Sequence, residues 1–592
     1  MLFGKHFRRY YFIFGHLFLL GIAVLILVDW IQLDIPKLVG GIIDTLGSTN
    51  PDQDLVLSSI KTIGLLAIVI TIGRFLWRYT IFGASRRIEF RLRNAMFTHA
   101  TKLSQSYYSQ EKVGGLMTYF INDLEAIRMT FGPGILMIVD GLMLGGFSLY
   151  RMANLNGRLT LYASIPMLAL LIIMIFIRKQ ISKKFKVRQE AFEKLSDFTQ
   201  ENFSGITVIK AFVREIKEYM FFQKKNEDLY DKHLSFVKYV VIINIIVGAA
   251  INLVILSIVL FGSLLVINRD QTGLTAGQLT EYISYFFSLI WPVMALSQFM
   301  QIQGQAKASA ERITKFLDHP YDVYDTPEAK NVQGLKGEII AKNLTFQYPD
   351  GDSPVLKNVS FEIKQGEMVG VLGRTGSGKS SLVDLFLRIY NLEKGQLFID
   401  NYDIMELSLE SVRDAIGYVP QDNFLFSETI RNNIGFAYDK PDLKKVEESA
   451  RLADVYDNVI EFKDGFETML GERGVTVSGG QKQRISIARA LSKDPEILIL
   501  DDSVSAVDTK TEESIIRNLH LIRKGKTTIF IAHRISTVKK MDKIILLDQG
   551  EIVAVGTHQQ LLKTSELYQD MVRRQQLETI VEGGDNHEGL QG

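Results

Sequence analysis

The 592-residue chain contains no cysteine, which excludes disulfide bonds, thiolate metal sites and cysteine nucleophiles. It also lacks an excess of charge of either sign: the chain contains 67 Lys and Arg residues and 66 Asp and Glu residues, and the formal net charge is +1. Such a balance gives no overall field that would attract nucleic acid. The N-terminal stretch MLFGKHFRRYYFIFGHLFLL lacks a small-residue cleavage site, so we predict no cleavable signal peptide.

Apolar residues, in contrast, are abundant: they make up 47% of the chain and gather in long runs before residue 320. A helix needs about 20 such residues to cross the hydrocarbon of a bilayer. We therefore predict an α-helical membrane domain over residues 1–320. Buried helices of a large soluble protein are the alternative, but soluble cores rarely contain so many runs of this length. The six predicted spans centre near Leu25, Ile68, Leu142, Leu170, Ile251 and Leu289.

Basic residues set the expected orientation, because Lys and Arg accumulate on the cytoplasmic side of a membrane. The connections at residues 85–130 and 178–238 are rich in both, whereas the link between the first two spans has none before Lys61. We expect the N-terminus and both long connections in the cytoplasm, as helical extensions with a glycine-bearing break at each tip. Arg151 and Arg158 in the short third link do not follow this rule. The only explanation that the sequence offers for them is that their side chains snorkel to the head groups.

The pattern of the sequence changes after Asp318. Residues 321–335 carry a proline and turn formers and are predicted to form a linker. Over residues 336–575, short β-rich runs alternate with helical stretches, which predicts a soluble α/β domain with a largely parallel sheet. Residues 576–592 have little apolar content, and we expect a disordered tail there.

Three motifs of this α/β domain indicate nucleotide chemistry. The segment GRTGSGKS, residues 373–380, fits G-x-x-x-x-G-K-[ST] and follows the strand-like EMVGVL. In such a loop, backbone N–H groups wrap phosphates, Lys379 reaches the β and γ phosphates and Ser380 ligates Mg²⁺. ILILDD predicts a buried strand ending in Asp501 and Asp502, of which Asp501 is expected to hold Mg²⁺ through water. Between them, VSGGQKQR predicts a second helix start that suits an anion.

With these motifs in this order, the chain resembles the ATP-binding cassette exporters, as a half-transporter whose membrane domain precedes its nucleotide domain. The resemblance extends over about residues 10–575. It implies six exporter-type transmembrane helices fused to an α/β P-loop domain, and transport coupled to hydrolysis of ATP with Mg²⁺. It further implies that two nucleotide domains sandwich two ATP molecules, so that each site combines the Walker motifs of one chain with the VSGGQ segment of the other.

The resemblance assigns a role to each matching residue. Tyr348 stacks on adenine, and His533 lies beside the γ phosphate. Gln421 ligates Mg²⁺ together with Ser380 and Asp501. The other assigned positions are Gly373, Arg374, Thr375, Gly376, Ser377, Gly378, Lys379 and Ser381 around ATP, Ser478, Gly479, Gly480 and Gln481 toward a partner's ATP, and Asp508 at the end of the D-loop.

Asp502 departs from the family, whose hydrolytic sites usually place Glu after the Walker B aspartate to act on the attacking water. Asp is shorter by one methylene, roughly 1.3 Å of reach, and a misplacement of that order costs about 10²-fold in rate. The departure resembles one subunit of the heterodimeric multidrug exporters of bacteria. We therefore expect a slow site, with Asp502, His533 and Gln421 as its catalytic residues, and a partner chain that carries Glu. A homodimer whose backbone shifts to let Asp502 serve is the alternative.

The substrate is expected to be a small hydrophobic or amphiphilic drug, exported across a bacterial plasma membrane. Asp29 and Asp34 in the first span and Asp140 in the third are intramembrane acids, which mark functional sites by default. They are candidates to attract cationic amphiphiles to a cavity lined by Phe286, Phe287, Trp291 and Met294. Pairing with Arg74 or Arg78, or a position near the outer interface, is the alternative.

Two other functions remain open from the sequence. One is export of a lipid or a peptide by the same mechanism, although no cysteine peptidase precedes the spans. The other is a membrane-bound ATP sensor that regulates a partner without transport, which the short side chain of Asp502 keeps open.

Overall fold

The computed structural model describes residues 4–111, 113–267, 274–471, 474, 476–503 and 509–584, and it leaves out the side chains of residues 113, 166–179, 509 and 578–584. The chain divides into two compact units. The first unit comprises Met1–Thr98 and Gly114–Asp318, and the second comprises His99–Val113 and His319–Gly592.

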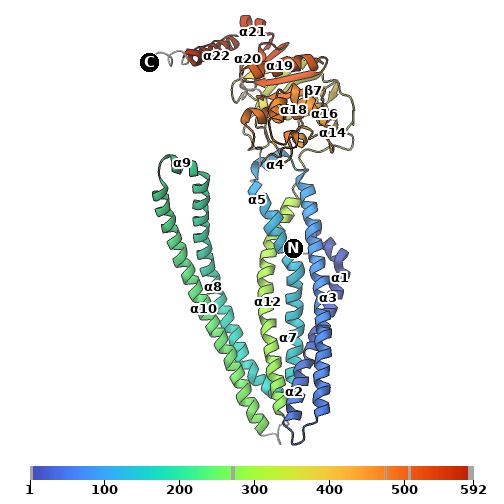
Figure 1. Ribbon diagram of the computed structural model, residues 1–592, viewed down its shortest axis with the longest axis vertical. Helices are drawn as coiled ribbons and strands as arrows, with labels where there is room; N and C mark the ends of the chain where they lie inside the picture. The colour runs from blue at the N-terminus through green and yellow to red at the C-terminus, as the bar shows by residue number, and fades with distance from the viewer. Residues whose placement is uncertain are drawn as a thin grey trace. The chain divides into compact units, whose positions relative to one another are not determined.

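Long helices joined by short connections make up the first unit (Figure 1). They are α1 (Lys5–Gln32), α2 (Asp34–Leu46), α3 (Gln53–Ala100), α5 (Val113–Thr118), α6 (Leu124–Met129), α7 (Ile135–Leu155), α8 (Gly157–Ser204), α9 (Ile206–Ala211), α10 (Glu215–Ile267) and α12 (Ala276–Leu317), with π-helical turns at Tyr119–Asp123 and Thr130–Gly134. Helices α8 and α10 lie side by side as a hairpin, and α9 forms its tip. The glycine-bearing break predicted in the second long connection is therefore a short helix at the tip.

Five described helical segments are long and apolar enough to cross a membrane. Each contains one of the predicted centres. The remaining prediction, near Leu170, falls within the continuous helix α8, but the side chains around it are outside the described part of the chain. The five segments are Lys5–Leu46, Gln53–Ala100, Gly114–Leu155, Glu215–Ile267 and Ala276–Leu317.

Close backbone packing joins α2 to the beginning of α12. A Cβ atom added to Gly277 would lie 2.0 Å from the carbonyl oxygen of Gly40, so a larger residue does not fit without movement of the backbone. Asp44 of α2 accepts a hydrogen bond from Thr275 Oγ1 at 2.5 Å and from the backbone N–H of Gly277 at 2.7 Å. The carboxylate thereby satisfies donors at the helix start that would otherwise lack a partner.

Two sheets form the framework of the second unit. Their strands are β1 (Ile339–Phe346), β2 (Leu356–Ile363), β3 (Met368–Gly373), β4 (Leu397–Ile399), β5 (Tyr402–Asp403), β6 (Ile416–Val419), β7 (Ile497–Asp501), β8 (Thr527–Ala532), β9 (Lys543–Asp548) and β10 (Glu551–Gly556). One sheet has the order β10-β9-β3-β8-β7-β6 and is parallel except for the β10–β9 pair. The other is antiparallel, in the order β2-β1-β4-β5. The predicted α/β fold with a largely parallel sheet is confirmed.

The six-stranded sheet separates two hydrophobic cores, because successive side chains of a strand point to opposite faces. Val371 and Ile499 pack into the core shared with the four-stranded sheet. Leu372 and Leu500 pack into the core on the other side, together with residues of α16, α18, α19 and α22. The helices of this unit are α4 (Gln105–Gln110), α13 (Lys379–Phe386), α14 (Leu409–Ala415), α15 (Ile430–Ile434), α16 (Leu443–Leu452), α17 (Tyr456–Ile460), α18 (Gly479–Ser492), α19 (Thr509–Ile522), α20 (Ile535–Val538), α21 (His558–Thr564) and α22 (Glu566–Gly584).

The structure differs from the predicted domain boundaries at the tip of the first long connection and in the linker. His99–Val113 groups with the second unit rather than with the rest of residues 1–320. Within that unit, Ser104 Oγ donates to Asp322 Oδ2 at 2.6 Å, and the backbone N–H of Lys330 donates to the carbonyl oxygen of Glu406 at 2.7 Å. These hydrogen bonds join residues far apart in sequence and tie the predicted linker over residues 321–335 to the rest of the second unit.

The C-terminal boundary differs as well. Helix α22 continues to Gly584, so the tail predicted to begin at residue 576 is helical over its first part. Residues 585–592 lie outside the described part of the chain. In the first half of the helix, Leu567, Met571 and Val572 pack against the large core of the unit. This packing stabilises a helix whose polar end does not suggest one.

Candidate functional site

Strand order brings the predicted motifs to one edge of the six-stranded sheet. The parallel strands β3, β8 and β7 are neighbours, with Leu372 paired to Ala532 and Asp501 paired to Ile531. Strand β3 leads into the phosphate-binding loop, β7 ends at Asp501, and β8 is followed directly by His533. Strand β6 lies beside β7 and leads toward Gln421, an exposed loop residue. The fold therefore gathers groups that are up to about 160 residues apart in sequence at one edge of the sheet.

The side chain of Lys379 lies inside the phosphate-binding loop. It is 5% exposed, and its Nζ donates to the carbonyl oxygens of Gly373 and Arg374, each at 2.9 Å. Burial lowers the pKa of Lys379 to about 8, although Asp501 and Asp502 act in the opposite direction. A polyphosphate would replace the two carbonyl oxygens as the partner of this ammonium group, which suits the predicted role.

Two glycines shape the loop around Lys379. Gly378, the residue before α13, has φ +98°, and Gly376 has φ +81°, a region that favours glycine. A Cβ atom at Gly378 would also lie 2.7 Å from Leu356 Cδ2. Of the other predicted ATP-binding positions, Ser377 and Ser381 are buried, whereas Arg374, Thr375, Gly376 and Ser380 are exposed and open to a ligand.

Asp501 is a buried carboxylate at the end of β7. Burial raises its pKa to about 6, and the neighbouring Asp502 adds to this effect. Lys379 and a hydrogen bond from the Tyr418 hydroxyl act in the opposite direction. A divalent cation beside Asp501 would offset the cost of its burial, and hydroxyl, amide and carboxylate oxygens are the ligands that Mg²⁺ prefers. Ser380, Gln421 and Asp501 thus carry oxygen ligands of the right chemistry for Mg²⁺.

Asp502 has an unusual backbone that fixes its position. Its φ is +44°, in the left-handed region that Asp and Asn enter more readily than most residues. Its N–H donates to the carbonyl oxygen of Ile531 at 2.9 Å, and its carbonyl oxygen accepts from Gln483 Nε2 at 3.2 Å. Any displacement of the Asp502 backbone toward a ligand would disturb both hydrogen bonds.

His533 is held between the phosphate-binding loop and Asp502. Burial and the nearby Lys379 lower its pKa, while Asp502 and a hydrogen bond to the backbone of Gly373 act to raise it. The ring therefore contacts the phosphate-binding loop, in keeping with the predicted position of His533 beside the γ phosphate. On its other side, the carbonyl oxygen of His533 accepts a hydrogen bond from Gln575 Nε2 at 2.7 Å.

The VSGGQ segment forms the start of α18, as predicted. Ser478 caps the helix: its hydroxyl accepts from the N–H of Gln481 at 3.3 Å, and Gln481 Oε1 accepts from the N–H of Ser478 at 2.9 Å. Ser478 and Gly479 are exposed, whereas Val477 is buried in the core and anchors the segment. An exposed helix start of this kind can bind an anion supplied by another molecule. The D-loop residue Asp508 lies outside the described residues.

Tyr348 lies beside the phosphate-binding loop, where a purine-binding residue was predicted. Its hydroxyl is 2.8 Å from Ser381 Oγ of α13, and its ring packs edge-on against Tyr390, with 5.1 Å between the centroids. Burial raises its pKa. These contacts hold the ring next to the residues that would surround the phosphates of the same nucleotide.

Tyr418 and Asp384 also belong to this site, although the sequence did not indicate them. The Tyr418 hydroxyl donates to Asp501, and burial raises the pKa of Tyr418. Asp384 of α13 lies near Asp501, and burial raises its pKa to about 6. The available signal was the position of Tyr418, two residues before Pro420, in a strand. To use this signal, one must know that this strand lies beside the strand that ends at Asp501.

The intramembrane acids have unequal surroundings. Asp34 forms an ion pair with Arg151 at 2.8 Å, and the Arg151 guanidinium lies over the ring of Trp30 at 4.7 Å from its centroid. The partner of Asp34 is thus Arg151 rather than Arg74 or Arg78, which also accounts for one of the two arginines that did not follow the positive-inside rule. Arg74 instead donates to Gln32 Oε1 at 2.7 Å.

Asp29 and Asp140 lie together in the helix packing. They are 3% and 8% exposed, and the two side chains interact with each other. Trp291 Nε1 donates to Asp140. Of the predicted cavity-lining residues, Phe287, Trp291 and Met294 are exposed, but Phe286 is buried against neighbouring helices and is a core residue instead.

Comparison with known proteins agrees with this organisation. Residues 18–293 match the ABC transporter transmembrane region, and residues 356–505 match the ABC transporter family. The probable multidrug resistance ABC transporter ATP-binding/permease protein YheI of Bacillus subtilis is 35% identical over 95% of this chain and 96% of its own length. The multidrug resistance-like ATP-binding protein MdlA of Escherichia coli is 35% identical over 98% of this chain and 96% of its own length.

A solved structure has the same fold. It is that of a bacterial Atm1-family ABC exporter with ATP bound, and it covers 96% of this chain with a TM-score of 0.74 and 24% sequence identity, while this chain covers 98% of it.

Proposed function

The chain belongs to the ATP-binding cassette transporters, as an exporter-type half-transporter coupled to ATP hydrolysis, and from this premise we propose that it is the slow-site subunit of a heterodimeric drug exporter. Its substrates are hydrophobic or amphiphilic small molecules, in keeping with the multidrug resistance names of its relatives. The chain is a multi-pass membrane protein with bacterial relatives, which supports a bacterial plasma membrane as its location.

The observation that carries the slow-site proposal is Asp502. Its backbone is tied to Ile531 and Gln483, so the carboxylate cannot compensate for its short side chain by moving the main chain at no cost. A general base must come within about 2.6–3.2 Å of the proton that it removes. These contacts favour a slow site over the homodimer in which the backbone shifts toward the water.

Nucleotide binding should nevertheless be retained at this site. Lys379, Ser380 and Asp501 keep the chemistry of the phosphate and Mg²⁺ ligands, and Tyr348 lies beside them. When it is bound, Mg²⁺ would neutralise phosphate charge. The residues of this chain would orient the phosphates through Lys379 and the loop amides. Slow turnover with intact binding is the combination that we propose for this subunit.

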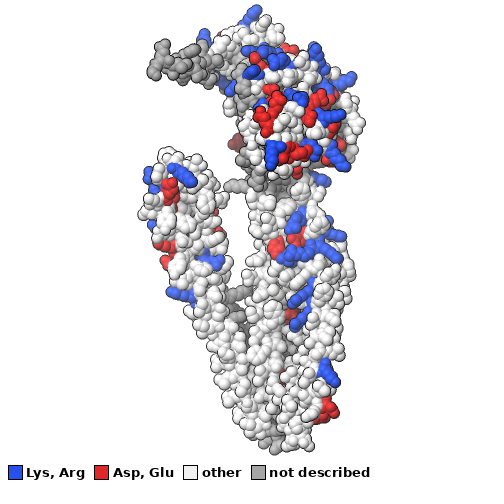
Figure 2. Space-filling model, viewed as in Figure 1, with Lys and Arg blue, Asp and Glu red and all other residues white. Residues whose placement is uncertain are grey.

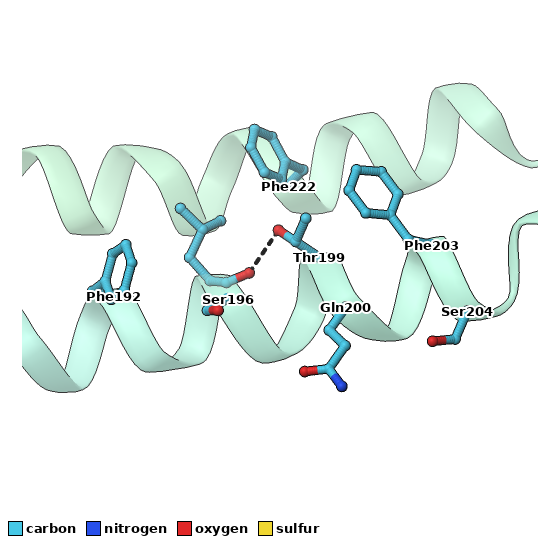
Figure 3. A pocket seen from close by; sticks show the side chains of 8 residues that line it. Phe192, Ser196, Thr199, Gln200, Phe203, Ser204 and Phe222 are labelled. Atoms are coloured by element: carbon cyan, nitrogen blue, oxygen red, sulfur yellow. Dashed lines mark hydrogen bonds between the residues drawn. The ribbon is translucent and has the colours of Figure 1, made fainter. Parts of the chain in front are cut away.

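A second half-transporter would complete two parts of this chain. The exposed start of α18 offers Ser478 to a nucleotide held elsewhere. The α8–α10 hairpin also exposes aromatic surface: in Figure 3, Phe203 points from α8 toward α10, which carries Phe222, and Phe203 is 72% exposed. A groove of about 690 Å³ there is lined by Phe192, Leu195, Ser196, Thr199, Gln200, Phe203, Ser204 and Phe222. We propose that the partner covers this hairpin.

Because the natural chain has no cysteine, a single cysteine at Phe203 tests this contact cleanly. Crosslinking of the Phe203→Cys variant to the second half-transporter supports coverage of the hairpin. A cysteine that reacts as rapidly with a soluble maleimide in the complex as in the isolated chain contradicts it.

The proposed orientation places the N-terminus and the nucleotide domain in the cytoplasm. On the face shown in Figure 2, Lys and Arg of the described part of the α8–α10 hairpin gather in the half near its tip. Since basic residues accumulate on the cytoplasmic side, this distribution supports a cytoplasmic tip.

Asp29 and Asp140 are the proposed acids of the substrate path. They interact with each other, and Trp291, which is 41% exposed, donates to Asp140. An aromatic ring beside a carboxylate suits an organic cation. Asp34 is already compensated by Arg151, so it serves as the control. We expect Asp29→Asn and Asp140→Asn to reduce efflux of a cationic dye; unchanged efflux in both would contradict this part of the proposal.

The subunit assignment is tested by purifying the full chain alone and with a candidate half-transporter that has Glu after its Walker B aspartate. We expect slow hydrolysis by the chain alone, fast hydrolysis by the pair, and little change in the pair when Asp502 is replaced by Ala. Fast hydrolysis by the chain alone that Asp502→Ala abolishes would overturn the assignment.

A further inference from the structure

The last helix of the chain contacts the loop that carries His533. Gln575 of α22 uses both ends of its side-chain amide there: Nε2 donates to the carbonyl oxygen of His533 at 2.7 Å, and Oε1 accepts from the backbone N–H of Ile535 at 2.7 Å. The two bonds flank Arg534, at the turn between β8 and α20. The Gln575 side chain thus holds the main chain at His533 and at Ile535, on the two sides of Arg534.

Helix α22 is itself held rigidly enough to act as a support. Tyr568 is fully buried in the core of the unit, and its hydroxyl is 2.7 Å from Nδ1 of His558 in α21. Met571 packs against the same core. Tyr568, Met571 and Gln575 are spaced by three and four residues, so they lie on one face of the helix. The face that buries Tyr568 therefore also presents Gln575 to the His533 loop.

The same helix contacts the phosphate-binding loop. Asp570 Oδ2 lies 3.7 Å from Arg374 Nη2, an exposed pair that contributes little by itself. His533 in turn bonds to the backbone of Gly373 in that loop. Helix α22 therefore contacts the loop that carries His533, through Gln575, and the phosphate-binding loop, through Asp570.

We propose that Gln575 is a positioning residue for ATP hydrolysis, which holds the carbonyl oxygen of His533 and thereby the direction of the His533 ring toward the γ phosphate. This proposal rests on the role of His533 inferred above, and it is independent of whether the site is slow. The ring extends from the residue whose carbonyl oxygen Gln575 binds. A rotation of that peptide changes where the ring points, and a misplacement of about 1 Å at a reacting group can cost about 10²-fold in rate.

The alternative is that Gln575 only caps α20 and stabilises the fold. The two bonds allow the roles to be separated. Gln575→Glu keeps an oxygen acceptor for the N–H of Ile535 but loses the donor to His533 and places a negative charge beside its carbonyl oxygen. Gln575→Ala removes both bonds. The next residue, Gln576, is exposed, so Gln576→Ala is a matched control on the same helix.

The test uses the full chain in lipid nanodiscs, together with its partner subunit where one is isolated. Single-turnover hydrolysis of bound ATP measures the rate even at a slow site, and the Kd for ATP is measured separately. We expect Gln575→Ala and Gln575→Glu each to lower the single-turnover rate by about tenfold with the Kd changed less than twofold, because the loop is displaced by only a part of 1 Å. Gln576→Ala should match the wild type.

A double-mutant cycle with His533→Ala makes the test specific. If Gln575 acts through the His533 ring, Gln575→Ala causes no further loss in the His533→Ala background. An equal additional loss in both backgrounds, a wild-type rate in Gln575→Glu, or a weakening of ATP binding that accounts for the whole effect would each overturn the proposal. A fast wild-type rate would instead refute the slow-site assignment and leave the comparison between variants intact.

Discussion

If the site is slow as we propose, replacement of Asp502 by Glu should make it fast. The change adds one methylene, or roughly 1.3 Å of reach, at a position whose backbone is held by hydrogen bonds to Ile531 and Gln483. If reach limits the rate, restoring it recovers up to about 10²-fold, which corresponds to about 2.7 kcal/mol of activation free energy.

The backbone of Asp502 opposes part of this gain. With φ at +44°, the residue lies in the left-handed region, which costs an L-residue about 1–2 kcal/mol relative to ordinary φ because Cβ approaches a carbonyl oxygen. Asp and Asn tolerate this conformation better than Glu. We therefore expect Asp502→Glu to lower thermal stability slightly and to raise the hydrolysis rate by about 10- to 100-fold.

The assay is single-turnover hydrolysis at saturating ATP, in a complex whose other site is inactivated. Asp502→Asn is the matched control, because it keeps the side-chain length and the preference for this backbone but removes the base. Its rate should stay at or below that of the wild type. If Asp502→Glu binds ATP normally and hydrolyses it no faster than the wild type, side-chain reach does not limit the rate and the reasoning is wrong.

Further predictions concern the charges of the nucleotide site and the helix packing. ATP affinity of the nucleotide-free protein should be highest between pH 6 and 8: below about 6 Asp501 gains a proton and competes with Mg²⁺, and above about 8 Lys379 loses its charge. Isothermal titration with Mg²⁺–ATP across this range checks the bell shape, which a flat profile would contradict. Lys379→Ala should weaken ATP binding by at least about 30-fold, since loss of a charge that faces a phosphate costs about 2 kcal/mol or more. Gly277→Ala should destabilise the membrane domain by about 1–3 kcal/mol, because its Cβ would lie 2.0 Å from a backbone oxygen. Gly41→Ala, with nothing within 4 Å, is its control in thermal unfolding.

The sequence predicted those parts of the site that are encoded by neighbouring residues. Lys379 and Ser380 lie in one short motif, and Asp501 and Asp502 end one strand, so local pattern suffices to find them. The strand type and the parallel sheet follow from the alternation of β-rich and helical runs. These features depend on contacts within a few residues of the chain.

Features that depend on contacts between distant segments could not be predicted in this way. Tyr418 reaches Asp501 only because β6 and β7 are neighbours in the sheet. Gln575 looked like the last residue before a tail, and its contact with His533 spans 42 residues of sequence. The ion pair between Asp34 and Arg151 joins residues 117 positions apart, which is why the sequence did not identify the partner of either residue.

The most direct test of the central claim identifies which chain retains unhydrolysed ATP in the assembled complex. After one turnover, photolabelling with azido-ATP carrying the label at either the α or the γ phosphate reports whether the nucleotide bound by each chain is still ATP. We expect this chain, with Asp502 after its Walker B aspartate, to keep the γ label while the partner loses it. Loss of the γ label from this chain within the same turnover would contradict the account.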